Sequence, residues 1–390
     1  MDKLSKLLNK KRKHVFSNDD YLGANISLST NQESEKSIEI NTKIENNNIL
    51  FKNNPNLRYK EDIIYDNDSI GFNDLFDIFS SNIDNKLYII SPNKISFSLD
   101  IYLLENTNQI VNSLKGHNNH ITMVKYYFNS NDNIKKEYII SADINGVVII
   151  WEINDINNYK KYDIKLKTND FIYSCLMYFE SINTYIITST CGKDDTKLFI
   201  LNNQNNIKFV KNIKNSKNNN VYYLLIWPNK ISKEMHLIQF CKKKIVISNI
   251  NSNEIYWNLI DEKNKDGPYM NGFIYSNKKN ENEYYEYLYS VSMNGYINVW
   301  ELHQKLLINS IFINNNFLNQ IIQWNENYII MTNGNKNNIL IMDLNCRRII
   351  SNIFSKHEKG IINIKKVVHP IYGESLLSCG LEGSIFLWNV

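Results

Sequence analysis

Tyr138-Ile-Ile-Ser-Ala-Asp-Ile-Asn-Gly-Val-Val-Ile-Ile-Trp-Glu152 is the stretch that decides the fold of this 390-residue chain. One apolar run leads to Asn145-Gly146, and a second apolar run follows and ends at Trp151. Asn-Gly between two apolar runs is a strong signal of a β-hairpin, because both residues tolerate the positive φ that a tight turn requires. The stretch therefore predicts two antiparallel strands joined by a short turn.

The same pattern recurs along the chain. Residues 287–301 repeat it around Asn294-Gly295 and end at Trp300, and residues 375–389 repeat it around Glu382-Gly383 and end at Trp388. Weaker copies occupy 86–104, 184–201, 235–250 and 328–344, so that successive copies lie 42 to 52 residues apart. A four-stranded propeller blade takes about 40–45 residues. The repeat predicts an all-β fold, a single seven-bladed β-propeller of four-stranded antiparallel blades.

These residues resemble the WD-repeat (transducin beta-like) β-propeller family over 56–390. The best match is the second blade, with Gly116-His117 before its innermost strand and Trp151 at the end of its third strand. In that family an Asp six residues before the Trp shares a buried hydrogen-bond set with the His. In this chain the position is occupied by Asn145, Asn294 and Glu382. The resemblance therefore leaves undecided whether most blades contain this hydrogen-bond set. The resemblance implies a structural repeat signature made of His117, Asn145, Gly146, Trp151, Asn294, Gly295, Trp300, Glu382, Gly383 and Trp388.

Closure of the ring is predicted from the end of the chain. Val390 follows Trp388 so closely that the last blade has no fourth strand of its own, and an unpaired edge is a liability. We expect residues 57–65 to pair with residues 384–388. Near-continuous apolar runs predict innermost strands buried on both faces, at 71–79, 121–128, 171–179, 221–227, 269–276, 317–324 and 361–367.

The sequence divides into a tail, residues 1–55, and the propeller, residues 56–390. The tail is polar and rich in Asn, Ser and Glu, which predicts that most of it is disordered. Leu4, Leu7 and Leu8 have helical spacing and precede a basic run of Lys10, Lys11, Arg12 and Lys13. This run is a nuclear-import signal, an anchor to an anionic surface, a helix that docks on a partner, or a solvated charge run.

Composition narrows the class of protein. The chain has 44 basic and 40 acidic residues, a balance that does not by itself indicate a nucleic-acid-binding protein. Its five cysteines are far apart and form no Cys-x-x-Cys pair, so we expect neither a disulfide framework nor a zinc site. There is neither an apolar run long enough to span a membrane nor a secretory signal. We expect a cytoplasmic or nuclear protein.

Candidate chemical groups are few. His117 and His120 could be read as metal ligands, but the Gly-His position in the family turns inward to a structural hydrogen bond. No nucleophile stands beside a base in the sequence, and we expect a protein that is not an enzyme and has no metal or cofactor. Arg347-Arg348 resembles the arginine pair by which some propellers hold phosphoinositides, but Cys346 and Ile349 replace the residues that flank that pair. We expect both arginines to lie on the outer strand of blade six, and we favour the interpretation that their charges protect this strand from aggregation.

The resemblance implies a protein–protein interaction scaffold or adaptor, a monomeric propeller that binds other proteins within a larger assembly. Its binding loops would include 116–120, 169–171, 266–269 and 357–360. A second hypothesis is a nuclear ribonucleoprotein-assembly or ribosome-biogenesis factor that binds RNA through the basic tail. Further alternatives are a ubiquitin-ligase substrate receptor, for which we see no adaptor-docking element, and a phosphoinositide effector.

Overall fold

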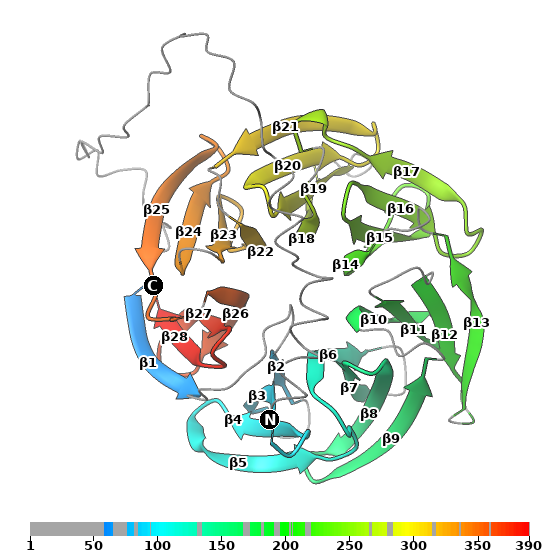
Figure 1. Ribbon diagram of the computed structural model, residues 1–390, viewed down its shortest axis with the longest axis vertical. Coiled ribbons are helices and arrows are strands. Elements are labelled where there is room, and N and C mark those ends of the chain that lie inside the picture. The colour runs from blue at the N-terminus through cyan, green and yellow to red at the C-terminus, as the bar shows by residue number, and fades with distance from the viewer. Residues whose placement is uncertain are drawn as a thin grey trace, which may run out of the picture. The chain divides into compact units, whose positions relative to one another are not determined.

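The computed structural model describes residues 58–64 and 76–389, with gaps at 82–84, 94, 131–134, 167–171, 181–182, 191–195, 203, 205, 215–219, 265–266, 279–283, 314–316, 335–336 and 359. Over these residues the fold is all-β, with 28 strands and one 3-10 helix, η1 (Glu262–Asn264). The strands form seven four-stranded antiparallel sheets in a ring (Figure 1). The predicted seven-bladed β-propeller is confirmed.

Each of the first six blades uses four consecutive strands, which run from the centre of the ring to its rim. The innermost strands are β2 (Asp77–Ser80), β6 (Ile121–Asn129), β10 (Ile172–Glu180), β14 (Val221–Pro228), β18 (Tyr269–Lys278) and β22 (Leu318–Gln323). The second strands are β3 (Leu87–Pro92), β7 (Lys136–Asp143), β11 (Asn183–Thr190), β15 (Met235–Cys241), β19 (Tyr284–Ser292) and β23 (Tyr328–Asn333). The third strands are β4 (Leu99–Leu103), β8 (Val147–Asp155), β12 (Thr196–Leu201), β16 (Ile245–Asn249), β20 (Tyr296–Glu301) and β24 (Asn338–Asp343). The rim strands are β5 (Asn106–Leu114), β9 (Asn158–Lys165), β13 (Ile207–Ile213), β17 (Ile255–Leu259), β21 (Leu306–Phe312) and β25 (Arg348–Phe354).

The seventh blade is completed from both ends of the described chain. It contains β26 (Ile361–His369), β27 (Gly373–Gly380) and β28 (Ile385–Asn389), and its rim strand is β1 (Arg58–Ile64). β1 pairs antiparallel with β28, with Arg58 opposite Asn389 and Ile64 opposite Ile385. Blue β1 accordingly lies along the rim beside red β28 (Figure 1). The predicted closing strand is confirmed, and it removes the open edge that β28 would otherwise present.

The predicted innermost strands agree with the observed strands to within a few residues in blades two to seven. In the first blade, β2 begins at Asp77, and residues 71–75 of the predicted strand lie outside the described residues. The seven hairpins predicted from the repeat correspond to the second and third strands of the blades. Local apolar runs and turn residues determine these hairpins, because each strand pairs with its neighbour in the sequence.

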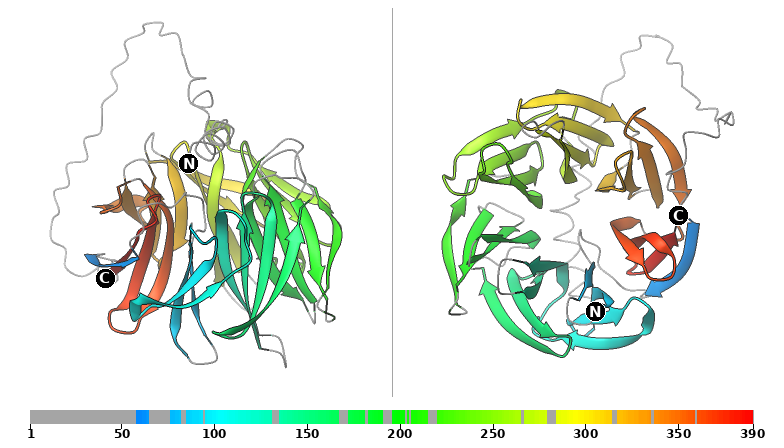
Figure 2. Two further views of the ribbon diagram at one scale, coloured as in Figure 1. Left: turned by 60° about the horizontal axis from the view of Figure 1, so that its bottom comes forward. Right: turned by 180° about the vertical axis from the view of Figure 1, so that it is seen from behind.

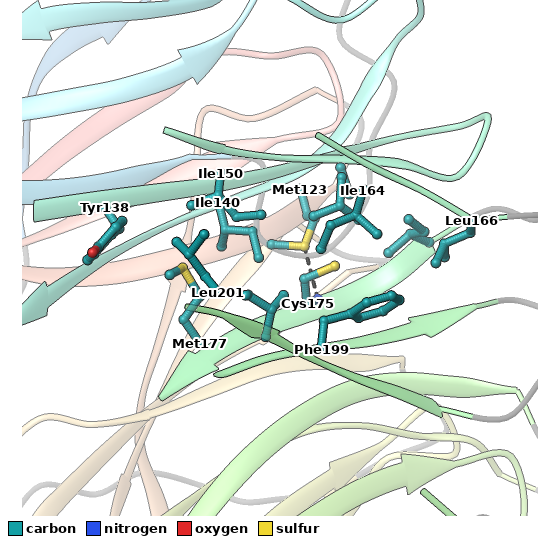
Figure 3. Close-up of a cluster of buried hydrophobic side chains, with 14 residues drawn as sticks. Met123, Tyr138, Ile140, Ile150, Ile164, Leu166, Cys175, Met177, Phe199 and Leu201 are labelled. Atoms are coloured by element: carbon teal, nitrogen blue, oxygen red, sulfur yellow. Dashed lines mark hydrogen bonds between the residues drawn. The ribbon is translucent and has the colours of Figure 1, made fainter. Parts of the chain in front are cut away.

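The hydrophobic core lies between the blades. It consists of seven clusters, each formed by two adjacent blades, including the seam of blades seven and one. In the seam of blades two and three, Ile140 and Ile150 face Met177 and Leu201 (Figure 3). Because each sheet is covered on both faces by a neighbour, its central strands read as continuous apolar runs instead of alternating ones.

Polar bonds connect neighbouring innermost strands. A register shift follows the first residue of six of them, β6, β10, β14, β18, β22 and β26. Carbonyl groups at these shifts accept hydrogen bonds from the preceding blade, from Thr122 Oγ1 to Ile172 O at 3.2 Å and from Asn319 Nδ2 to Ile362 O at 2.9 Å. A bulge leaves backbone groups without ladder partners, so these side chains satisfy them and tie the blades together.

Similar bonds act at the rim, where each rim strand reaches toward the next blade (Figure 2). Asn253, in the turn before β17, donates through Nδ2 to Asn212 O of β13 at 3.0 Å. Lys305, in the turn before β21, donates through Nζ to Tyr256 O of β17 at 3.0 Å. Polar contacts therefore join some neighbouring blades near the centre of the ring and others at its rim.

Candidate functional site

The loop that enters blade two is held by a buried polar set. His117 Nδ1 lies 3.0 Å from Asp143 Oδ2, and His117 Nε2 lies 2.8 Å from Ser141 Oγ. Trp151 Nε1 donates to the same Ser141 oxygen at 2.9 Å. All four residues are buried. A neutral imidazole protonated on Nδ1 uses every group: it donates to the carboxylate, accepts from the serine hydroxyl, and leaves the serine oxygen to accept from the indole.

Asp143 also shapes the turn that follows it. Its Oδ1 accepts the backbone N–H groups of Asn145 at 2.9 Å and Val147 at 3.0 Å. Gly146 takes a positive φ of 81° in this turn. One buried carboxylate therefore connects the entry loop of the blade, through His117, with the turn between β7 and β8. Both segments belong to the same end of the ring.

Gly116 packs closely against the tryptophan of the same set. A Cβ at this position would lie 3.0 Å from Trp151 Cη2 and 3.0 Å from Lys161 Cδ, which is tighter than ordinary contacts. The backbone before His117 therefore packs directly against the indole ring. This close approach gives the Gly-His dipeptide a physical reason in this chain.

Blade seven contains a second complete set. His357 Nδ1 contacts Glu382 Oε1, and His357 Nε2 lies 2.8 Å from Ser378 Oγ. Trp388 Nε1 donates to Ser378 Oγ at 2.8 Å. The imidazole also stacks on Phe386, with ring centroids 4.2 Å apart. Glutamate thus takes the role that aspartate has in blade two, and its longer side chain reaches the histidine from a turn position two residues further along.

Blade five retains half of the set. Trp300 Nε1 donates to Ser290 Oγ at 3.0 Å, as in the other two blades. A different group organises its entry loop: buried Asp261 accepts from Asn298 Nδ2 and Ser310 Oγ, both at 2.6 Å. The carboxylate of blade five therefore lies before η1 and binds the third and fourth strands.

The structure separates the predicted signature residues into two groups. His117, Trp151, Trp300, Glu382 and Trp388 are buried members of the hydrogen-bond sets. Asn145 and Asn294 are exposed turn residues, and Gly146, Gly295 and Gly383 follow in the turns with φ of 81°, 79° and 96°. The basic residues Lys10, Lys11, Arg12 and Lys13 lie outside the described residues.

Sequence reasoning missed Asp143, His357 and the three serines. The family pattern places the carboxylate at Asn145, two residues after Asp143, and places the histidine after glycine, whereas Lys356 precedes His357. A usable signal existed in the spacing, because His117 precedes Ser141 by 24 residues and His357 precedes Ser378 by 21. In each complete set, as in blade five, the serine lies ten residues before the tryptophan.

Blades four and five are joined by a polar cluster of another kind. Glu286 Oε2 accepts from Trp227 Nε1 of the neighbouring blade at 2.9 Å and lies 3.0 Å from His303 Nε2. Its other oxygen accepts from Ser276 Oγ at 3.1 Å. Trp227 also packs against His236, with centroids 4.9 Å apart, and burial lowers the pKa of that histidine. These residues carried no recognisable sequence signal, because their partners lie on different blades.

The remaining residues that the sequence analysis discussed are His120, the arginine pair and the cysteines. His120 meets the ring of Phe97 edge-on at 5.1 Å, so it and His117 have different neighbours. Arg347 is in the turn before β25 with a φ of 55°, and Arg348 begins that strand; both are exposed. The expectation that both arginines lie on the strand was therefore wrong for Arg347. Burial raises the pKa of the Cys241 thiol to about 12 and also raises the pKa of Cys175 and Cys379.

The predicted binding loops 116–120 and 357–360 are entry loops of blades two and seven, and their histidines anchor them in the core. The predicted loop 169–171 lies wholly outside the described residues, and so do residue 266 of loop 266–269 and residue 359 of loop 357–360. Among the described residues, no group of three or more His, Cys, Asp and Glu is placed to hold a metal ion. No helix in the described part of the chain is long and apolar enough to cross a membrane.

The ring of seven four-stranded blades defines the class of the protein as a β-propeller. The family model described as WD domain, G-beta repeat matches residues 108–152, which include His117, Ser141, Asp143 and Trp151. The chain thus contains a WD repeat within its ring of seven blades. No curated protein matches it at a significant level. Propellers of this family generally mediate interactions between proteins and are generally not enzymes.

Proposed function

We propose that the protein is a non-enzymatic scaffold or adaptor subunit of a multiprotein assembly. The observation that carries the proposal is the anchoring of entry loops by buried sets in blades two and seven. His117 and Asp143 hold one loop and one hairpin turn at the same end of the ring, and His357 and Glu382 do the same in the last blade. Loops held in one conformation lose little entropy on binding, which favours recognition of proteins and peptides.

The partners of the reactive side chains support a role without catalysis. Both ring nitrogens of His117 and of His357 are bonded inside the buried sets. The raised pKa values of Cys175, Cys241 and Cys379 keep these thiols protonated near neutral pH. A general base needs a free lone pair and a nucleophilic cysteine needs its thiolate. These histidines and cysteines therefore serve packing and hydrogen bonding.

Affinity purification from the protein's own cells tests the proposal. The tagged full-length chain is compared with a version that lacks residues 1–55 and with the loop variant Glu358→Arg/Lys115→Glu. We expect a discrete set of proteins with the full-length chain, the same set without the tail, and loss of some members with the loop variant. Recovery of no stable partner by the full-length chain would contradict a scaffold role.

A nuclear ribonucleoprotein-assembly factor is the second candidate, and the basic run at Lys10 to Lys13 favours it. This function predicts nuclear accumulation that is lost when the four residues are replaced by glutamine. It also predicts that RNA co-purifies and dissociates steeply with rising salt, because phosphate contacts release counterions. If the glutamine variant keeps its location and its partners, this candidate is wrong. The protein is then a cytoplasmic or nuclear scaffold whose basic run is not a targeting signal.

A further inference from the structure

Aromatic side chains share one face of the hairpin that β18 and β19 form in blade five. Phe273 of β18 pairs with Tyr289 of β19, and Tyr275 pairs with Tyr287. Tyr285 lies two residues before Tyr287 on the same strand. Residues directly opposite each other, or two apart along a strand, lie on the same face of a sheet. We call Phe273, Tyr275, Tyr285, Tyr287 and Tyr289 the aromatic ladder.

Rings of the ladder stack in parallel pairs. The centroids of Phe273 and Tyr289 lie 5.2 Å apart with planes at 5°, and those of Tyr285 and Tyr287 lie 6.4 Å apart with planes at 10°. The first pair packs against the cluster that blades five and six share, where β18 and β19 lie beside β22 and β23 (Figure 1). Tyr275, Tyr285 and Tyr287 continue this face toward the end of the hairpin, and all three are half-buried.

The corresponding tyrosine of blade two is covered by its neighbouring blade. Tyr138 lies three residues before Ser141, as Tyr287 lies three residues before Ser290, and both serines accept the bond of their blade's tryptophan. Tyr138 is only 3% exposed, and Phe179 of blade three stacks on it with centroids 5.8 Å apart. The same place in blade five therefore needs a ring from blade six to be closed.

Blade six does not supply that ring. β10 of blade three has nine residues and continues past Phe179 to Glu180, whereas β22 of blade six has six residues and ends at Gln323. Trp324, which follows β22, is buried in the other seam, with blade seven. Among the described residues, the ring that stacks on Tyr287 is Tyr285 of its own strand. The short innermost strand of blade six thus leaves the ladder half-buried.

The surroundings of the ladder favour a neutral ligand. Burial raises the pKa of Tyr287, and the carboxylate of Glu301, its partner on β20, adds to this shift. Burial also raises the pKa of Tyr289, and the guanidinium of Arg347 opposes that shift. The hydroxyls therefore keep their protons near neutral pH and can donate hydrogen bonds. The charges that act on these tyrosines are of both signs, which does not suit a polyanion.

We propose that the aromatic ladder binds a proline-rich segment of a partner protein in the polyproline II conformation. This proposal rests on the scaffold function and names the chemistry of one partner. Proline rings pack against the aromatic rings, and tyrosine hydroxyls donate to carbonyl groups of the segment. A polyproline II segment has no internal hydrogen bonds, so its carbonyl groups can accept them. Because the segment is already extended, it loses little entropy when it docks on aromatic side chains.

Fluorescence anisotropy with the purified full-length protein tests the proposal. The probe is a labelled 12-residue peptide that repeats Pro-Pro-Leu-Pro. Its comparisons are the peptide with serine in place of every proline and a 12-nucleotide oligouridylate, because bases also stack on aromatic side chains. We expect the proline peptide to bind at least about tenfold more tightly than the other two, since it alone is pre-ordered and carries the rings. Its binding should change little with salt, as contacts between neutral groups do.

Three results of this measurement overturn the proposal. They are the absence of binding by the proline peptide, equal binding of the serine peptide, and tighter binding of the oligouridylate. The last result would indicate a surface for single-stranded nucleic acid.

Matched variants locate the site. Tyr285→Ala/Tyr287→Ala should weaken binding about tenfold or more, because aromatic anchors carry most of the energy of such contacts. Tyr287→Phe keeps the ring and should weaken binding severalfold through the lost hydrogen bond; unchanged affinity overturns the role of this hydroxyl. The control is Tyr159→Ala/Tyr162→Ala on rim strand β9, which removes two half-buried tyrosines of blade two and should alter binding less than about twofold. Equal loss in the control overturns the assignment to the ladder.

Thermal melts show whether each variant is folded. If Tyr285→Ala/Tyr287→Ala does not fold, Tyr285→Leu/Tyr287→Leu takes its place, because leucine keeps apolar volume without the flat ring, and the same loss of binding is expected. A cellular comparison separates this proposal from the scaffold function. If the full-length chain recovers its partners and the double variant recovers the same set, the ladder proposal is wrong and the scaffold role stands. If the full-length chain recovers none, the scaffold role is wrong, whatever the peptide result.

Discussion

At the scale of the residue, the two buried histidines show how one side chain can join several segments. His117 bonds a carboxylate with one nitrogen and a serine with the other, and the serine passes the connection on to Trp151. In such a buried set, each group provides the hydrogen-bond partner of the next group. Removal of one group therefore leaves the others without a hydrogen-bond partner. The stability of the blade therefore depends on the complete set.

His117→Ala should lower the free energy of unfolding by about 2–4 kcal/mol, because Asp143 becomes a buried carboxylate without its imidazole partner and a cavity forms. Urea denaturation followed by tryptophan fluorescence measures the change. Asn145→Ala, in the exposed turn two residues after Asp143, is the control and should change stability by about 0.5 kcal/mol or less. A loss below about 1 kcal/mol for His117→Ala would mean that the set is not needed for stability.

A second residue-scale prediction concerns pH. Burial lowers the pKa of His236 in the folded state, so the unfolded chain binds its proton more readily. Stability is then unaffected by this group above the unfolded pKa of about 6.5, and is lost as the pH falls below it toward the folded pKa. His236→Phe, which keeps an aromatic ring against Trp227, should reduce the fall in stability between pH 7 and pH 5.5. An unchanged slope in denaturation measured at several pH values would contradict this.

At the scale of the element, the closing strand β1 matters more than its seven residues suggest. It pairs with β28 along the rim of blade seven and so connects the beginning and the end of the described propeller. A rim strand has a paired neighbour on one side only, but without β1 the strand β28 would present an unpaired edge. The contribution of β1 is therefore to complete the last sheet.

Deletion of residues 57–65 should abolish the single cooperative melt, since blade seven loses its rim strand and the seam with blade one loosens. Circular dichroism and differential scanning calorimetry measure the transition. The deletion of residues 1–55 is the control and should leave the melting temperature within a few degrees of the intact chain. A melt that stays cooperative and unshifted without residues 57–65 would show that the ring closes by other means.

At the scale of the whole molecule, the blades share their cores, so we expect the ring to unfold as a unit. Every hydrophobic cluster joins two blades, and no described cluster belongs to one blade alone. Polar bonds at the inner and outer ends of the seams add to this, and Glu286 with Trp227 closes the seam of blades four and five. Local damage to a seam is therefore expected to affect the whole ring.

Glu286→Ala should destabilise the protein by about 2–4 kcal/mol, because the indole of Trp227 and the hydroxyl of Ser276 lose a buried acceptor. The melt should move to lower temperature as one transition, with the calorimetric and van't Hoff enthalpies in agreement. Glu254→Ala, an exposed glutamate in the turn before β17, is the control. Two separate transitions would show that blades four and five unfold independently of the ring.

The sequence by itself determined the hairpins, their number and the closing strand. Asn145-Gly146, Asn294-Gly295 and Glu382-Gly383 mark turns between strands that are neighbours in the chain, and such local pairings are specified by local turn chemistry and apolar pattern. The buried sets were only partly predictable. Trp151 and His117 were recognisable as signature residues, but Asp143 stood two residues from the expected place.

Only the tertiary structure decided which side chains meet across the seams. Trp227 and Glu286 lie 59 residues apart on different blades, and Gln239 meets Lys214 only because β13 reaches the next blade. Packing between sheets brings together residues whose separation along the chain carries no periodic signal, so these contacts had to come from the fold.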